Sequence, residues 1–122
     1  MSWDAELIDD ATGEAIYDTN YTHNTNVMAN LVLYPDTDTS QTVFEEVFAP
    51  KRPSWWVALD GLSGAAGARY LDRIIKGLRA EPERFRALNP TNKWGDYDRF
   101  VARLEEMRDA VPEAASTWRV SG

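Results

Sequence analysis

Apolar and polar side chains alternate in two segments at the start of the chain. Every second residue from Trp3 to Leu7 is apolar, and a second alternation runs from 14 to 21. Such alternation places one row of side chains on each face of a β-strand. Residues 9–13, between the two segments, have the Asp-Asp-Ala-Thr-Gly composition of a turn. The pattern therefore predicts a β-hairpin with strands at about 2–9 and 14–21.

Further along the chain, apolar residues recur at the spacing of helices. The clearest stripe runs from Leu71 to Leu78, with apolar residues at positions i, i+3, i+4 and i+7. Ser63 and Asp96 each precede a segment of this kind and are expected to cap it, and prolines are expected to end the helices. We predict helices at about 26–33, 64–80, 83–88 and 97–110.

Two remaining segments complete the expected architecture. The polar stretch 35–54 contains three prolines and predicts a long loop, with a short helical turn at 43–48. The tail 116–121 alternates again and predicts a third strand, which we expect to join the hairpin because a lone strand leaves its backbone unpaired. The order predicts an α+β fold in one domain, 1–122: a small antiparallel three-stranded sheet with three to four helices packed on one face.

The composition excludes several kinds of site. The chain has no cysteine and a single histidine, so disulfides, thiolate zinc sites and histidine clusters are ruled out, and we expect neither a metal nor a cofactor. The formal net charge of -7 argues against direct binding to nucleic acid or to an anionic membrane. No segment approaches the roughly 18 apolar residues of a membrane span. No basic leader opens the chain, so we predict a soluble, cytoplasmic protein.

The densest polar segment spans residues 20–26, with three asparagines, two threonines, a tyrosine and the only histidine. Two interpretations are open. In the structural one, Asn20 and Asn24 bridge the end of a strand to the start of a helix, with Thr22 and Asn24 as caps. In the functional one, the segment is a binding rim whose amides form hydrogen bonds to a ligand and whose Tyr21 stacks on it.

A second polar cluster, residues 88–98, precedes the last predicted helix. Its Asn and Asp residues include oxygen ligands suited to a cation, but their spacing does not match a calcium-binding helix-loop-helix site. We favour a structural interpretation, in which Asn89 is a cap, Trp94 is wedged into the core and Asp96 is the N-cap of the last helix.

Catalysis would fall to His23 and a nearby carboxylate. No nucleophile or orienting carboxylate lies at a recognised spacing from His23, so we interpret it as a structural residue. Asp60, before Gly61, is interpreted as part of a turn rather than a ligand for a cation or hydroxyl. A small hydrolase using His23 with Asp60 or Asp96 is the least supported hypothesis, and we expect a protein that is not an enzyme.

Three motifs are spread over most of the chain. They are Asn-Tyr-Thr-His-Asn at 20–24, Leu-Asp-Gly at 59–61 and Asn-Pro-Thr-Asn-Lys-Trp-Gly-Asp-Tyr-Asp at 89–98. Together they resemble a family of small proteins encoded by bacteriophages and prophages, many of actinobacterial hosts. The third motif is the most specific, and in it Lys93 stands where the family most often has glycine. The resemblance implies a phage-related context in a host cell and transfers no catalytic residue.

Two binding functions follow as hypotheses. The leading one is a non-enzymatic phage accessory protein that binds a host or phage protein, with Trp55, Trp56 and the 35–54 loop as the contact region. The alternative is a small nucleotide-like ligand held where the two Asn-rich segments converge. In that case an arginine would contact the phosphate, and the remaining contacts would come from hydrogen-bonding and stacking side chains: Asn20, Asn24, Asn92, Asp96, Tyr21 and Trp94.

Overall fold

The computed structural model describes residues 2–35 and 53–122, so the predicted helical turn at 43–48 lies outside the described residues. The elements follow one another as β1 (Ser2–Asp9), β2 (Ala15–Thr22), η1 (His23–Thr25, a 3-10 turn), α1 (Asn26–Leu33), α3 (Trp55–Leu59), α4 (Gly64–Ala80), α5 (Pro82–Arg86), α6 (Tyr97–Asp109) and β3 (Ser116–Ser121).

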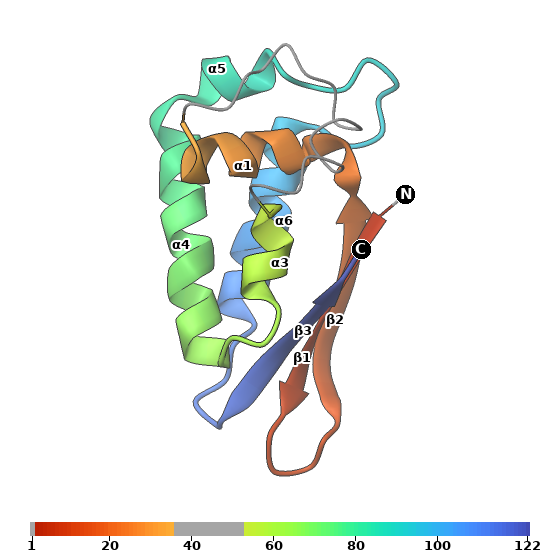
Figure 1. The fold of residues 1–122 in the computed structure, drawn as a ribbon, viewed down its shortest axis with the longest axis vertical. Helices are drawn as coiled ribbons and strands as arrows, with labels where there is room; N and C mark the ends of the chain where they lie inside the picture. The colour runs from red at the N-terminus through yellow and green to blue at the C-terminus, as the bar shows by residue number, and fades with distance from the viewer. Residues whose placement is uncertain (1, 36–52) are drawn as a thin grey trace.

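The three strands form one antiparallel sheet in the order β2-β1-β3 (Figure 1). Trp3 lies opposite Tyr21 on β2, and Leu7 lies opposite Trp118 on β3. Alternation along β1 directs its apolar residues, Trp3, Ala5 and Leu7, to one face, where all three are fully buried. The apolar side chains of the central strand therefore form the part of the core that lies against the sheet.

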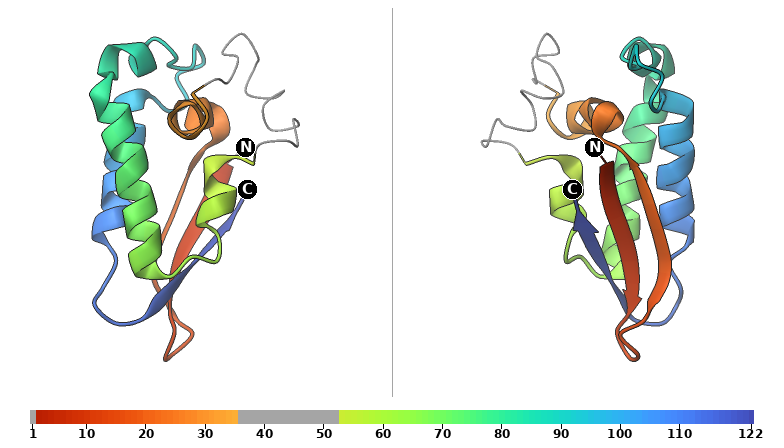
Figure 2. Two further views of the ribbon diagram at one scale, coloured as in Figure 1. Left: turned by 60° about the vertical axis from the view of Figure 1, so that its left-hand side comes forward. Right: turned by 90° about the vertical axis from the view of Figure 1, so that its right-hand side faces the viewer.

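The helices cover that same face of the sheet and leave the other face bare of any described helix (Figure 2). Helices α4 and α6 pack against each other along their length, α1 crosses their upper end, and α3 lies beside β3. One cluster of buried residues joins the sheet to all the helices. The predicted α+β fold, with a three-stranded antiparallel sheet and helices on one face, is confirmed.

Helix α4 packs closely against strand β3. The predicted stripe from Leu71 to Leu78 is buried, and the Ser63 hydroxyl caps the helix by accepting from the Ala66 amide at 3.2 Å. Gly67 lies directly against the indole of Trp118, where a Cβ atom would collide with the ring. Glycine at this position allows strand β3 to approach the helix.

The three strands and helices α1, α4 and α6 lie within one residue of the predicted bounds, and two other elements differ from the predictions. The short helix α5 begins at Pro82 and ends at Arg86, somewhat before the predicted 83–88. Helix α3 was not predicted, because five residues behind a proline-rich stretch are too few to show a helical period. It matters for the site because it places Trp55 inside the protein and Trp56 near the surface.

Candidate functional site

The two Asn-rich segments converge in space. The Asn24 amide nitrogen donates to the side-chain oxygen of Asn92 and to the main-chain oxygen of Trp94, both at 3.4 Å. The Tyr21 hydroxyl accepts from the Asp96 amide at 3.2 Å and lies 3.5 Å from the Asp96 carbonyl oxygen. The end of β2 and the loop before α6 therefore form one unit, which we call the junction (residues 20–24 and 92–96).

The loop of the junction has a defined conformation. The Asn92 side-chain oxygen accepts from the Trp94 amide at 3.0 Å, which closes a tight turn. Lys93 and Gly95 both have positive φ angles, 62° and 87°. The left-handed conformation costs a non-glycine residue about 1–2 kcal/mol, so Lys93 is strained where glycine would not be. At Gly95, a side chain would also collide with Thr22.

Trp94 points out of the junction into solvent. Its side chain is 66% exposed, so the prediction that Trp94 is wedged into the core is wrong. The core at this end is already filled by other rings, with Phe85 stacked on Tyr97 and Phe100 stacked on Tyr21. The loop hydrogen bonds fix the backbone while the indole stays outside, which is an unusual arrangement for a large aromatic side chain that is highly buried on average.

An open hollow of about 520 Å³ lies beside Trp94. It is lined by Ser2, Asn20, Tyr21, Thr22, Lys93, Trp94, Gly95, Arg99 and Arg103. Three of these residues are cations, and the described lining contains no carboxylate. In a chain with a net charge of -7, this is a local concentration of positive charge beside an exposed aromatic ring.

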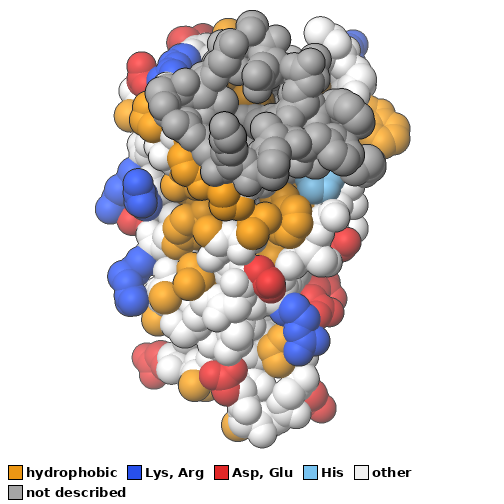
Figure 3. Space-filling model, viewed as in Figure 1, with side chains coloured by type: hydrophobic (Ala, Val, Ile, Leu, Met, Phe, Trp, Pro, Cys, Tyr) orange, Lys and Arg blue, Asp and Glu red, His pale blue; other side chains and the backbone are white. Residues whose placement is uncertain are grey.

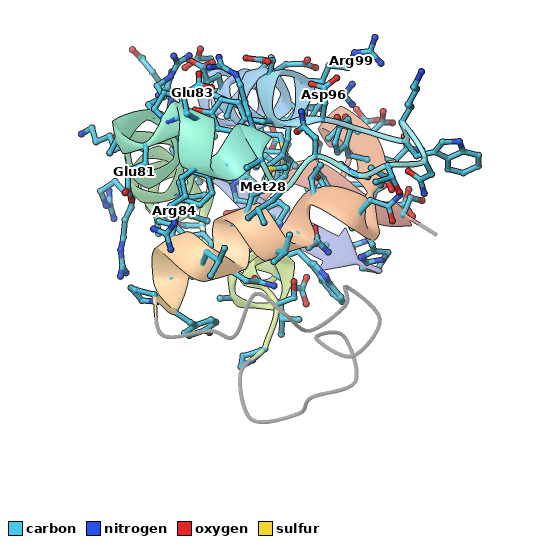
Figure 4. The ribbon with its side chains drawn as sticks, turned by 90° about the horizontal axis from the view of Figure 1, so that it is seen from above. Met28, Glu81, Glu83, Arg84, Asp96 and Arg99 are labelled. Carbon is cyan, nitrogen blue, oxygen red and sulfur yellow. The ribbon has the colours of Figure 1, made fainter. Side chains whose placement is uncertain are left out.

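The three cations differ in how they are held. Arg103 is anchored, because its Nη1 donates to the Asn20 carbonyl at 2.9 Å and to the Thr19 hydroxyl, and its guanidinium lies 5.6 Å from the centre of the Tyr21 ring. Arg99 extends outward from the first turn of α6 (Figure 4), with its Nε 3.6 Å from an Asp96 carboxylate oxygen. Lys93 is exposed on the loop.

Two of the predicted site residues in the junction also have structural roles. Asp96 is the N-cap of α6, as predicted, since its carboxylate accepts from the Arg99 amide at 2.8 Å. Burial raises the pKa of Tyr21, so its hydroxyl stays protonated and can both donate to and accept from the loop. These residues support the hollow, and its exposed side chains are the ones free to contact a ligand.

The other half of the 20–26 segment is buried in a polar network. The indole nitrogen of Trp55 donates to the Asn26 side-chain oxygen at 2.9 Å, and the Asn26 amide nitrogen lies 2.8 Å from Nδ1 of His23. Because Trp55 can only donate, it fixes the orientation of the Asn26 amide, and Nδ1 of His23 must then accept. His23 is therefore neutral, and burial lowers its pKa.

This arrangement gives His23 a structural role. The side chain is only 6% exposed, and no carboxylate in the described parts of the chain forms a hydrogen bond with it. Asp60 is also occupied, because its carboxylate accepts from the Val120 amide at 2.8 Å and so covers the outer edge of β3. Gly61, with a φ of 87°, makes the predicted turn. Within the described residues, His23 forms no hydrogen bond with Asp60 or Asp96, the partners that the hydrolase hypothesis gave it.

The predicted contact region at Trp55 and Trp56 is divided by α3. Trp55 is fully buried and packs edge-on against Trp3, with ring centres 5.0 Å apart, so it is not available as a surface anchor. Trp56 is half-buried, and its neighbour Val57 is 43% exposed. Hydrophobic side chains gather over α3 on this face of the molecule (Figure 3).

The other arginines near this end of the molecule are already paired. Arg79 lies 2.6 Å from a Glu105 oxygen, and Arg84 lies 3.0 Å from one of Glu81. Arg86 binds both Glu83 and Asp98. Figure 4 shows Glu83 and Arg84 on α5, and Glu81 just before this helix, away from Arg99. Within residues 2–35 and 53–122, no group of three or more His, Cys, Asp or Glu side chains is suited to hold a metal.

Sequence reasoning missed the three cations of the hollow. Arg99 and Arg103 are four residues apart on α6, a spacing that places both on one face of a helix, and this was the available signal. Their proximity to Lys93 depends on the left-handed loop, which no local pattern predicts.

Comparisons with models of protein families, with curated proteins and with solved structures give no match for this chain. The resemblance to phage-encoded proteins therefore stays a prediction. None of the helices described here is both long and apolar enough to cross a membrane.

Proposed function

We propose that this chain is a non-enzymatic binding protein for a small anionic ligand with a planar ring, of the nucleotide type, and that the hollow beside Trp94 holds it. The observation that carries the proposal is an indole kept 66% exposed by an ordered loop, next to three cations with no carboxylate in the described lining. An exposed aromatic ring and three cations in one hollow suit a ligand with both a π-face and a negative charge.

Each part of the ligand has a matching group. A planar ring stacks on Trp94, an interaction worth about 1–3 kcal/mol for a base on an aromatic side chain. The anionic group accepts from Arg99, Arg103 or Lys93, and a hydrogen bond to a charged group contributes about 1.5–3 kcal/mol. The Asn20 side chain, on the edge of the hollow, is available to orient the ring.

A binding role without chemistry is consistent with the rest of the molecule. The only histidine is part of the buried network, and the carboxylates of Asp60 and Asp96 accept hydrogen bonds from backbone amides. The motif resemblance adds to the proposal a phage context and the cytoplasm of the host cell as the place where the ligand is bound.

Calorimetric titration with AMP tests the proposal. We expect saturable binding to the wild type, and binding at least about tenfold weaker for Trp94→Ala, from the loss of stacking. Val57→Ala is the matched control, because it also removes an exposed apolar side chain but lies on α3. The proposal fails if AMP and related planar anions give no heat of binding, or if both variants bind as the wild type does.

A protein partner is the second candidate, and the apolar surface over α3 favours it (Figure 3). Its anchors would be Trp56 and Val57 rather than the buried Trp55. Capture of a host or phage protein that Val57→Asp abolishes, and that Ile16→Asp preserves, would support this candidate. Ile16 is a suitable control because it is equally exposed, at 45%, but belongs to β2.

A further inference from the structure

The hollow beside Trp94, which we call the basic hollow because Lys93, Arg99 and Arg103 line it, is surrounded by carboxylates. These carboxylates limit how much negative charge a ligand can carry. On the sheet side, Asp4 lies directly opposite Asn20, a residue that lines the hollow. Asp4 is two residues from Ser2 and Asp18 is two residues from Asn20, each on the same face of its strand, a distance of about 7 Å. Each of these exposed residues is therefore about one Debye length, about 8 Å at physiological salt, from a residue that lines the hollow.

A second hollow, of about 660 Å³, continues over the bare face of the sheet from this point. It shares Asn20 and Arg103 with the basic hollow, and its other lining includes Asp4, Glu6 and Asp18. An elongated ligand leaving the basic hollow across Asn20 would therefore pass three carboxylates. Arg119 is the one further cation in the described lining of this second hollow.

Carboxylates also limit the opposite side of the hollow, at the start of α6. Asp96 lies 3.6 Å from Arg99 and already offsets part of its charge, whereas Asp98 is paired with Arg86. On the next turns of the helix, the Arg103 Nε lies 3.9 Å from a Glu106 oxygen. The positive charge is thus local, and it is neutralised within one side chain's reach in both directions.

We propose that the hollow selects a ligand with one compact anionic group, a nucleoside monophosphate or a compound of the same charge pattern, and discriminates against polyphosphates. This inference rests on the proposed function. A single phosphate lies between the cations, whereas the second and third phosphates of a triphosphate extend toward Asp4 and Asp18. Repulsion between these like charges in water is modest, and we expect AMP to bind about fivefold more tightly than ATP.

Calorimetric titrations with AMP and ATP, in the absence of divalent cations, measure this preference. In the double variant Asp4→Asn, Asp18→Asn, the AMP-to-ATP ratio of affinities should fall to about one or reverse, because two negative charges are removed without a change in side-chain shape. The matched control is Glu14→Gln, Glu113→Gln, which removes the same charge from exposed positions in the hairpin turn and in the loop before β3. The control should keep the wild-type ratio.

The outcomes separate the two proposals. If AMP binds and is weakened by Trp94→Ala, but ATP binds as tightly as AMP, the proposed function stands and the selectivity is overturned. The selectivity is also overturned if the control variant changes the ratio as much as the Asp4, Asp18 variant does. If neither nucleotide binds, the proposed function and the selectivity both fail.

Discussion

One seven-residue segment, 20–26, contributes to two polar regions that differ in almost every physical respect. His23 and Asn26 turn inward and form a buried network with Trp55, in which each polar group meets a specific partner. The Tyr21 hydroxyl and the Asn24 side chain tie the end of β2 and the turn after it to the loop that carries Trp94. The inner region has no net charge and no accessible side chain. The outer region lies beside three cations and an exposed indole.

The difference shows what distinguishes a structural polar cluster from a binding surface. Both regions are rich in asparagine, so polarity alone does not separate them. In the buried network, Asn26 joins Trp55 to His23, so removing one partner leaves another unsatisfied. At the junction, hydrogen bonds hold the loop backbone, but the side chains of Lys93 and Trp94 stay exposed. Substitutions should therefore affect stability in the first region and binding in the second.

The largest expected effect is that of Asn26→Ala. This change leaves the Trp55 indole nitrogen and Nδ1 of His23 buried without their partner, and each unsatisfied group costs about 1–3 kcal/mol. We expect the free energy of unfolding in urea to fall by about 2–5 kcal/mol. Asn24→Ala, at the surface of the same segment, should cost less than about 1 kcal/mol. Equal losses in the two variants would show that the two regions do not differ as described.

The next effect is a loss of stability in mild acid. His23 has a lowered pKa when folded, so the unfolded chain binds a proton first, at its ordinary pKa of 6.5. The contribution of neutral His23 to the free energy of unfolding is therefore fully present above about pH 6.5. It is lost as the pH drops toward the folded pKa, by at most about 1.4 kcal/mol per pH unit. Urea unfolding of the wild type and of His23→Gln between pH 7 and 5 measures this loss.

The wild-type curve should be steeper than that of the variant in this interval. Carboxylates with lowered pKa values, such as Asp72 and Asp98, act at lower pH, below their ordinary value of 3.8, and are common to both proteins. Parallel curves would mean that His23 is not held neutral by the network.

Lys93→Gly should stabilise the protein while weakening the proposed binding. Glycine adopts the φ of 62° without strain, so we expect a gain of about 1 kcal/mol, partly offset by the greater freedom of glycine in the unfolded chain. Loss of the ammonium group should at the same time reduce the affinity for AMP. A gain in stability without any loss of affinity would exclude Lys93 from the binding surface.

The smallest stability effect is expected for Trp94→Ala. An indole that is 66% exposed contributes little burial, and the loop is held by the side chains of Asn92 and Asn24. The free energy of unfolding should change by less than about 0.5 kcal/mol. A loss above about 2 kcal/mol would indicate that the indole packs inside, as the sequence had led us to predict.

The sequence predicted the regular elements well, because their patterns are local. The alternation around Trp3 and the stripe from Leu71 to Leu78 each state which face is buried, and the caps Ser63 and Asp96 mark where the long helices begin. Helix α3 escaped prediction because a single helical turn has no period to detect.

The site was harder to predict, because it depends on distant partners. That the segments around Asn24 and Asn92 meet was a hypothesis that only the structure could test. The position of Trp94 was predicted wrongly, since hydrophobicity favours burial and the positive φ angles that turn this loop outward are not encoded in composition. The buried role of Asn26 could not be predicted from the sequence either, because its donor, Trp55, is far along the chain.

The most direct test of the central claim follows the indole N–H signals of the five tryptophans by two-dimensional NMR during a titration with AMP. The signal of Trp94, assigned with Trp94→Phe, should shift and saturate, while that of Trp55 should stay in place because its hydrogen bond to Asn26 is buried. A saturating shift of Trp55 with Trp94 unmoved, or no shift of any indole at AMP concentrations that saturate binding, would contradict the account.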